Sequence, residues 1–239
     1  MHRLTFVVCL ALLSVAPGPP LAAQTPTAPP LRPADALYMG QGLVLTAAPP
    51  RQLTLNAHVP QFLYQPGGDS LAYVSVQTDG DRQTTSVKFV DARQKDHDTR
   101  TIYSVTGDAP EAPVHDPQIY SLDLLGWSAD GRWLLIREGN TSNFLNTRFL
   151  LGDVGASPLG TRDFPQPEPP SGADFTLDGA AWSPDRRRIL IARQGFRHDA
   201  SVTVRATSAE VYDPSRNAAQ TLAIGDGLNL LGWRDEDHL

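Results

Sequence analysis

Apolar and polar residues alternate along most of the chain, in short runs separated by turn-forming residues. Valine, threonine, tyrosine and phenylalanine alternate with polar residues in 85–93, 99–105, 146–154, 201–214 and 218–225, as expected for half-buried strands. Proline and glycine are spread along the whole length, and no long apolar stripe with a helical period occurs. The pattern therefore predicts an all-β fold built from many short strands.

One unit of this pattern recurs along the chain. A short apolar strand ends in an aromatic residue, a tight turn follows, and a second apolar strand returns. The aromatic positions are Tyr64, Trp127, Trp182 and Trp233. Their spacings of 63, 55 and 51 residues are near the length of a four-stranded propeller blade with loop insertions. The turns read PGGD, SADG and SPDR, whose residues preset φ, tolerate positive φ or bond back to the backbone.

These turns resemble the TolB-type β-propeller repeat, in which W-S-P-D-G joins the two inner strands of a blade. The run from Trp182 to Arg186 matches four of the five positions, and so does the run from Trp127 to Gly131. The segment 51–54 resembles the outer strand that precedes each repeat in that family. The resemblance covers about 37–239 and implies four-stranded blades, about three in number plus the start of a fourth. Trp127 and Trp182 are expected to be wedges in the core between blades.

The fourth repeat stops shortly after Trp233. Either the segment 36–47 completes a fourth blade and closes a small ring, or the chain is an open arc of a longer propeller. We expect the open arc. Such an arc leaves an edge strand unpaired, which predicts either self-association through that edge or poor stability.

The N-terminus has the pattern of an export signal. His2 and Arg3 precede the apolar run 4–16, which is shorter than the ~20 apolar residues needed to cross a bilayer. Cleavage is expected after Ala22 or Ala23; an uncleaved membrane anchor is the alternative. The chain then divides into a signal peptide (1–23), a proline- and alanine-rich tether (24–36) and the repeat region (37–239), and we expect a periplasmic or extracellular location. The only cysteine, Cys9, is lost with the signal, so the mature chain offers no thiol chemistry.

Charge and composition narrow the range of partners. The chain is 41% apolar and carries a formal net charge of −6, which suits a globular domain and lacks the basic field of a nucleic-acid binder or a polybasic lipid site. We expect neither partner, and no integral membrane segment after signal cleavage.

The sequence predicts no catalytic, cofactor-binding or metal-binding residue, and therefore a protein that is not an enzyme. Similar propellers precede the hydrolase domain of prolyl oligopeptidase-type peptidases, but no G-x-S-x-G nucleophile elbow occurs and the nearest run, 126–130, lies on a predicted hairpin turn. The histidines lack ligand spacing. Two further segments are interpreted as exposed: the charged 95–100, as a solvated loop, and the arginines 186–188, in a hairpin turn. The acidic segment 78–83 lacks the remaining ligands and the closing glutamate of a calcium loop, and 140–142 fits the short glycosylation acceptor pattern.

A binding function remains. Two long proline-rich connections, 106–120 and 155–174, are either recognition loops, since loops on a rigid scaffold carry most binding sites, or simple spacers between blades. We expect a non-catalytic scaffold for a protein or peptide partner. The alternatives are the truncated propeller of a prolyl oligopeptidase-type peptidase that lacks its hydrolase domain, or a sugar- or small-ligand-binding protein.

Overall fold

The computed structural model describes much of the repeat region. It covers residues 37–39, 43–45, 51–52, 58–67, 70–91, 99–115, 117–140, 147–163, 173–199, 202–222, 232–236 and 238. All the regular secondary structure within these ranges consists of strands, so the predicted all-β class is confirmed. A membrane-spanning helix, long and apolar enough to cross a bilayer, does not occur in the part described. The expected signal peptide and tether lie outside it.

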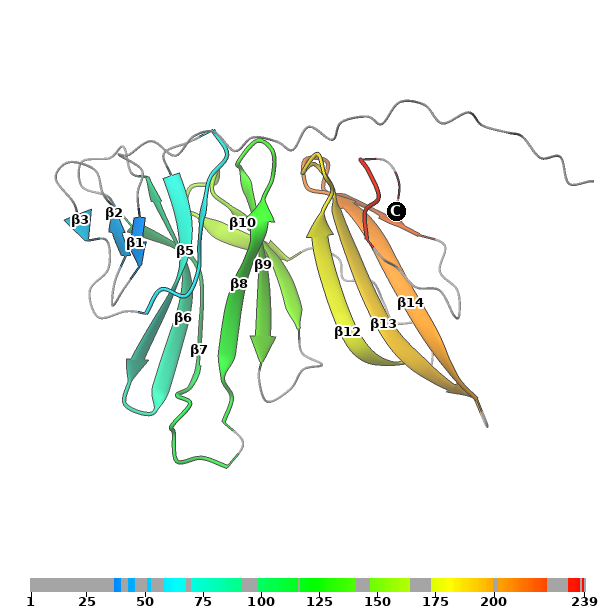
Figure 1. Cartoon of the computed structure of the whole chain (residues 1–239), viewed down its shortest axis with the longest axis horizontal. Helices are drawn as coiled ribbons and strands as arrows, with labels where there is room; N and C mark the ends of the chain where they lie inside the picture. The colour runs from blue at the N-terminus through cyan, green and yellow to red at the C-terminus, as the bar shows by residue number, and fades with distance from the viewer. Residues whose placement is uncertain are drawn as a thin grey trace, which may run out of the picture.

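Strands that follow one another along the chain pair antiparallel in four sheets (Figure 1). The N-terminal sheet contains β1 (Leu37–Met39), β2 (Leu43–Leu45) and β3 (Arg51–Gln52). The first sheet contains β4 (Phe62–Tyr64), β5 (Ser70–Asp79), β6 (Arg82–Asp91) and β7 (Thr99–Asp108). The middle sheet contains β8 (Tyr120–Trp127), β9 (Trp133–Asn140), β10 (Arg148–Asp153) and β11 (Gly160–Asp163). The last sheet contains β12 (Ala173–Trp182), β13 (Ile189–Asp199), β14 (Val202–Asp213) and β15 (Ala218–Thr221).

The sheets stand side by side in a row. Figure 1 places the N-terminal sheet at one end of the row and the last sheet at the other, with the C-terminus beside it. The strands β1 and β2 pair with each other, and β2 pairs with β3. This arrangement agrees with an open row of sheets.

Most predicted strands are present, with two differences. The predicted connection 155–174 contains β11, which pairs with β10 through residues 160–163. The connection 106–120 is also shorter than predicted, because β7 continues to Asp108. Within the charged segment 95–100, only the last two residues are described, and they begin β7.

The middle sheet is buried on both faces because it packs against the first sheet on one side and the last sheet on the other. Side chains alternate along a strand, so each strand contributes to both contacts. On β9, Leu134 and Ile136 join a core cluster with the first sheet, whereas Trp133 and Leu135 join a cluster with the last sheet. The first of these clusters also contains Trp127, which is 3% exposed. Its place between the first and middle sheets confirms the expected wedge. Trp182 is partly buried and packs against the second cluster.

A repeated hydrogen bond joins successive units. Trp127 Nε1 donates to the carbonyl oxygen of Leu63 at 3.4 Å, and Trp182 Nε1 donates to that of Gly126 at 3.0 Å. Trp233 Nε1 donates to the carbonyl oxygen of Ala181 at 3.2 Å. In each case the acceptor is the residue just before the aromatic of the preceding unit. The repeat therefore fixes both a hairpin and its place beside the previous hairpin.

A side-chain amide provides a second link at the start of the middle sheet. Gln61 Nε2 donates to the carbonyl oxygen of Leu124, and Leu124 N donates to Gln61 Oε1, both at 2.8 Å. The pairing of β8 with β9 shifts register between Leu124 and Gly126. Gln61 thus binds the backbone at the irregular point of β8 and holds it against the first sheet.

Gly126 is required by both its backbone and its surroundings. Its φ is +137°, which L side chains rarely adopt, and a Cβ there would lie 3.1 Å from Cδ1 of Trp182. The glycine lets the indole of the next unit approach the strand closely enough for its hydrogen bond.

Gly126→Ala is expected to lower the free energy of unfolding by about 1–3 kcal/mol from backbone strain, with a further loss if the Trp182 ring is displaced. Urea denaturation measures the change. Gly179→Ala is the matched control, because Gly179 also lies in a strand but has no atom within 4 Å of its ideal Cβ. Equal effects at the two positions would contradict the role given to Gly126.

A polar contact joins the outer parts of the first and middle sheets. The hydroxyl of Tyr103, on β7, donates to Oε2 of Glu138, on β9. Burial, followed by the hydrogen bond and the negative charge of Glu138, raises the pKa of Tyr103 from 10.0 to about 12. The folded state therefore keeps this proton at a pH where the unfolded chain has released it.

The stabilisation that this proton provides is expected to be complete below pH 10.0 and to be lost as the pH rises toward about 12. The free energy of unfolding of Tyr103→Phe should therefore fall less steeply than that of the unmodified chain between these two pH values. The difference in stability between the two proteins should narrow as the pH rises. Urea midpoints measured at several alkaline pH values test this. Glu138→Gln, which removes the charge, should give an intermediate slope; parallel slopes for all three proteins would refute the assignment.

Candidate functional site

The two turns with the W-S-x-D pattern are built by the same hydrogen bonds. In the turn after β8, Ser128 Oγ donates to Oδ1 of Asp130 at 2.5 Å and accepts from the backbone N–H of Trp133 at 2.9 Å. Asp130 Oδ1 also accepts from the backbone N–H of Arg132 at 3.1 Å. The serine and aspartate thus satisfy main-chain donors that the turn leaves without a strand partner.

The turn after β12 repeats this network. Ser183 Oγ donates to Oδ1 of Asp185 at 2.5 Å and accepts from the backbone N–H of Arg188 at 3.0 Å. Burial favours a higher pKa for Asp185, but hydrogen bonds from Ser183 and from the backbone N–H of Arg187 outweigh it and lower the pKa. Asp185 is therefore a turn-forming carboxylate, as the sequence predicted.

Neighbouring turns are joined to one another. The side-chain amide of Gln65 donates to the carbonyl oxygen of Gly131 at 2.7 Å, and the backbone N–H of Ala129 donates to the carbonyl oxygen of Arg186 at 3.0 Å. The turns of the first, middle and last sheets consequently form one continuous edge, which we call the turn rim.

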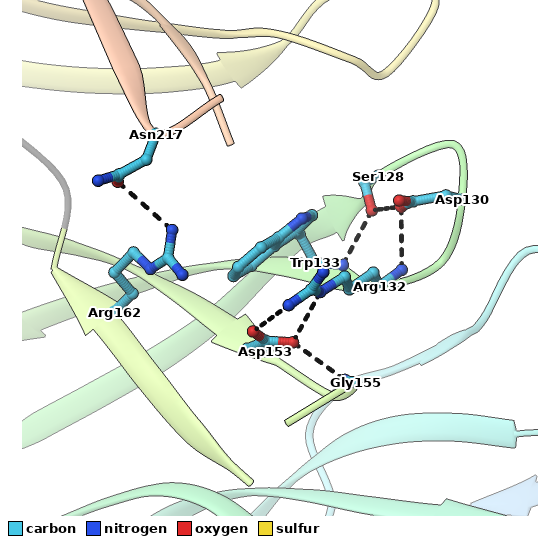
Figure 2. Close-up of polar contacts among 8 residues, drawn as sticks. All are labelled: Ser128, Asp130, Arg132, Trp133, Asp153, Gly155, Arg162 and Asn217. Carbon is cyan, nitrogen blue, oxygen red and sulfur yellow. Dashed lines mark hydrogen bonds and ion pairs between the residues drawn. The ribbon is translucent and has the colours of Figure 1, made fainter. Parts of the chain in front are cut away.

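Beside the turn rim, two guanidinium groups stack on one indole. The carbon Cζ of Arg132 and that of Arg162 each lie 4.7 Å from the ring centroid of Trp133. Figure 2 shows the ring between the two arginine side chains. Trp133 is 4% exposed, so the stack has a rigid base. Cation–π attraction of this kind is stronger where the groups are shielded from water.

Arg132 is held by an acidic partner. Its Nε and Nη2 donate to the two carboxylate oxygens of Asp153, on β10, at 3.1 and 3.0 Å. The backbone N–H of Gly155 donates to the same carboxylate at 3.0 Å. Burial favours a higher pKa for Asp153, but these hydrogen bonds outweigh it and lower the pKa. The bidentate pair therefore stays ionised and fixes Arg132.

Arg162 lies on β11 and reaches the last sheet. Its Nη1 donates to Oδ1 of Asn217 at 3.3 Å, as Figure 2 shows. The same oxygen accepts a hydrogen bond from the hydroxyl of Tyr212 at 2.8 Å. Asn217 has φ of +50° in the turn between β14 and β15, a conformation that asparagine tolerates better than most residues. Among the described residues neither side chain forms an ion pair with a carboxylate, and together they place nitrogen donors where two sheets meet.

The structure also shows where the other segments noted in the sequence lie. Residues 78–83 form a hairpin turn with Gly80 at φ of +57°. Arg186 and Arg187 are exposed and Arg188 is half-buried. Asn140, of the glycosylation-like run, is buried and its amide donates to Gln118. Within the ranges that the structure describes, no three His, Cys, Asp or Glu side chains lie together as metal ligands would.

Sequence reasoning missed the stack, although one signal was available. Three of the four tryptophans occupy the repeat position, and Trp133 does not. In the last sheet the equivalent place after the turn is occupied by Arg188. An aromatic that departs from the repeat could have directed attention to its neighbour Arg132. The positions of Asp153, Arg162 and Asn217 depend on how the strands come together and give no local signal.

Comparison with known proteins does not assign the chain to a group. No family model matches it, and no curated protein matches it significantly. The repeats and the turn rim therefore provide the evidence on function.

One residue of the turn rim is conformationally unfavourable. Arg186 has φ of +56°, where the equivalent Gly131 of the middle sheet has φ of +71°. Arg186→Gly is expected to stabilise the protein by about 0.5–1 kcal/mol, because a left-handed conformation costs a residue with a Cβ more than it costs glycine. Thermal denaturation measures the gain. Arg187→Gly, at an exposed neighbour without a positive φ, should bring no gain; a similar gain there would point to removal of charge instead.

Proposed function

We propose that the chain is an exported, non-catalytic β-propeller module that binds a protein or peptide partner. The propeller part is supported by three consecutive four-stranded sheets, each in simple up-and-down order, which is the arrangement of propeller blades. The tryptophan hydrogen bonds between first strands of successive sheets add support. On this proposal the sheets are about three blades of an open arc, with Trp233 at the start of the next.

The turn rim carries the binding proposal. Its turns are fixed internally by serine and aspartate, and to one another by the Gln65 and Ala129 hydrogen bonds. A surface that is already rigid loses little conformational entropy when a partner binds. The stacked Arg132 and Arg162 lie beside it on the buried base of Trp133. Aromatic and arginine side chains are the residues that most often anchor protein interfaces.

Self-association is a second interaction that the open row supports, since the sheets keep free edges. The edge strands β11 and β15 have four residues each, and β15 is exposed throughout, whereas the edge strand β7 has ten residues. Short edges limit this pairing in the middle and last sheets only.

Site-specific photo-crosslinking in cells of the source organism tests the binding proposal. A crosslinker at position 187 lies on the turn rim, and one at position 81 lies at the opposite end of the sheets, in the hairpin between β5 and β6 (Figure 1). We expect a discrete protein or peptide adduct from position 187 and none of the same mass from position 81. Identical adduct patterns, or none, would count against a partner at the turn rim.

The same cells test export. Mass spectrometry of the purified chain is expected to give an N-terminus at residue 23 or 24, as cleavage after Ala22 or Ala23 requires, in the exported fraction. Recovery of the intact N-terminus from the cytoplasmic fraction would refute this part of the proposal.

A further inference from the structure

Arg162, on β11, contacts an aromatic ring and a neutral amide. Within the described residues, five other arginines form ion pairs with aspartates: Arg82, Arg132, Arg137, Arg148 and Arg216. Arg162 forms no ion pair with a described carboxylate, and its hydrogen bond goes to the neutral Asn217. One face of its guanidinium is covered by Trp133. A guanidinium has five N–H donors, and within the described residues only one donor group of Arg162, Nη1, has an acceptor.

Asn217 adds donors of the same kind. Its Oδ1 accepts from both Arg162 and the hydroxyl of Tyr212, which assigns the oxygen to that side of the amide. The two N–H groups of Nδ2 therefore lie on the other side, and no described residue accepts from them. Asn217 is exposed and Arg162 is half-buried, so solvent reaches both groups. The two side chains together present donors and one positive charge.

Both groups are held in place before any ligand binds. Trp133 is 4% exposed and Tyr212 is 1% exposed, and these buried rings support Arg162 and Asn217 respectively. Because Arg162 comes from the middle sheet and Asn217 from the last, a ligand here would contact two sheets at once. Fixed donors reduce the entropy lost on binding.

We propose that Arg162 and Asn217 form a carboxylate-binding site for an acidic residue or the C-terminal carboxylate of a peptide. The inference rests on the proposed function and specifies the chemistry of its partner. A planar guanidinium matches a carboxylate through two parallel hydrogen bonds. A dianionic phosphate fits less well, because the ionised Asp153 lies on the same stack and interacts electrostatically with Arg162.

Calorimetric titration of the mature chain tests the proposal, with a short Glu-rich peptide as the probe. The same peptide with Gln in place of Glu, succinate and inorganic phosphate are separate arms. We expect the Glu peptide to bind and the Gln peptide to bind at least about 10-fold more weakly, since charge-assisted hydrogen bonds are the stronger ones. Tight binding of succinate alone would assign the site to a small acid, and preferential binding of phosphate would overturn the proposal.

Variants connect the binding to these two residues. Arg162→Gln should weaken binding of the Glu peptide at least about 10-fold. Arg148→Gln is the matched control, because Arg148 lies on the neighbouring strand and already pairs with Asp163 at 2.7 Å; its effect should stay within about twofold. Equal losses in the two variants would refute the site.

A second variant keeps the test valid if Arg162→Gln disturbs folding. Asn217→Asp places a carboxylate beside Arg162 and should occupy the site from within the chain. We expect it to retain or raise the urea midpoint and to abolish peptide binding; retained binding would refute the proposal. The outcomes are separable from those of the proposed function. A partner that still crosslinks at position 187 in cells carrying Arg162→Gln would support the proposed function and refute the carboxylate site.

Discussion

The arrangement of the sheets depends on a hydrogen bond between each repeat tryptophan and the unit before it. The indole N–H donates to the carbonyl oxygen that precedes the previous aromatic, and this contact occurs at Trp127, Trp182 and Trp233. A tryptophan combines a large apolar surface with a single donor, so one residue both fills the space between sheets and sets their relative position. This close approach requires a glycine at position 126, since a Cβ there would lie against the next indole.

In the turns, too, single side chains make two structural contacts each. Ser128 and Ser183 each bind an aspartate and a backbone N–H, which leaves little freedom in the turns that carry the following arginines. Where the repeat places Arg188 in the last sheet, the middle sheet has Trp133 with Arg132 and Arg162 on its ring. The middle sheet therefore differs from the last sheet at this position, and the difference creates the arginine–tryptophan stack.

Local chemistry accounts for the parts of the fold that were predicted correctly. The alternation of apolar and polar residues gave the strands, and the turn residues gave the hairpins that join β8 to β9 and β12 to β13. The strand β11 was missed, since Gly160–Asp163 is short and lies within a proline-rich stretch whose composition favours a loop. It forms because β10 offers an edge with which it can pair.

By itself the sequence determined the all-β class, the hairpin unit and the wedge position of Trp127, because each follows from residues close together in the chain. Only the tertiary structure decided that Trp133 supports two arginines, that Asp153 pairs with one of them and that Asn217 meets the other. Arg162 and Asn217 are brought together from different sheets, and no local pattern records such a contact. Their meeting depends on the packing of whole sheets, which is set by the burial of side chains far apart in sequence.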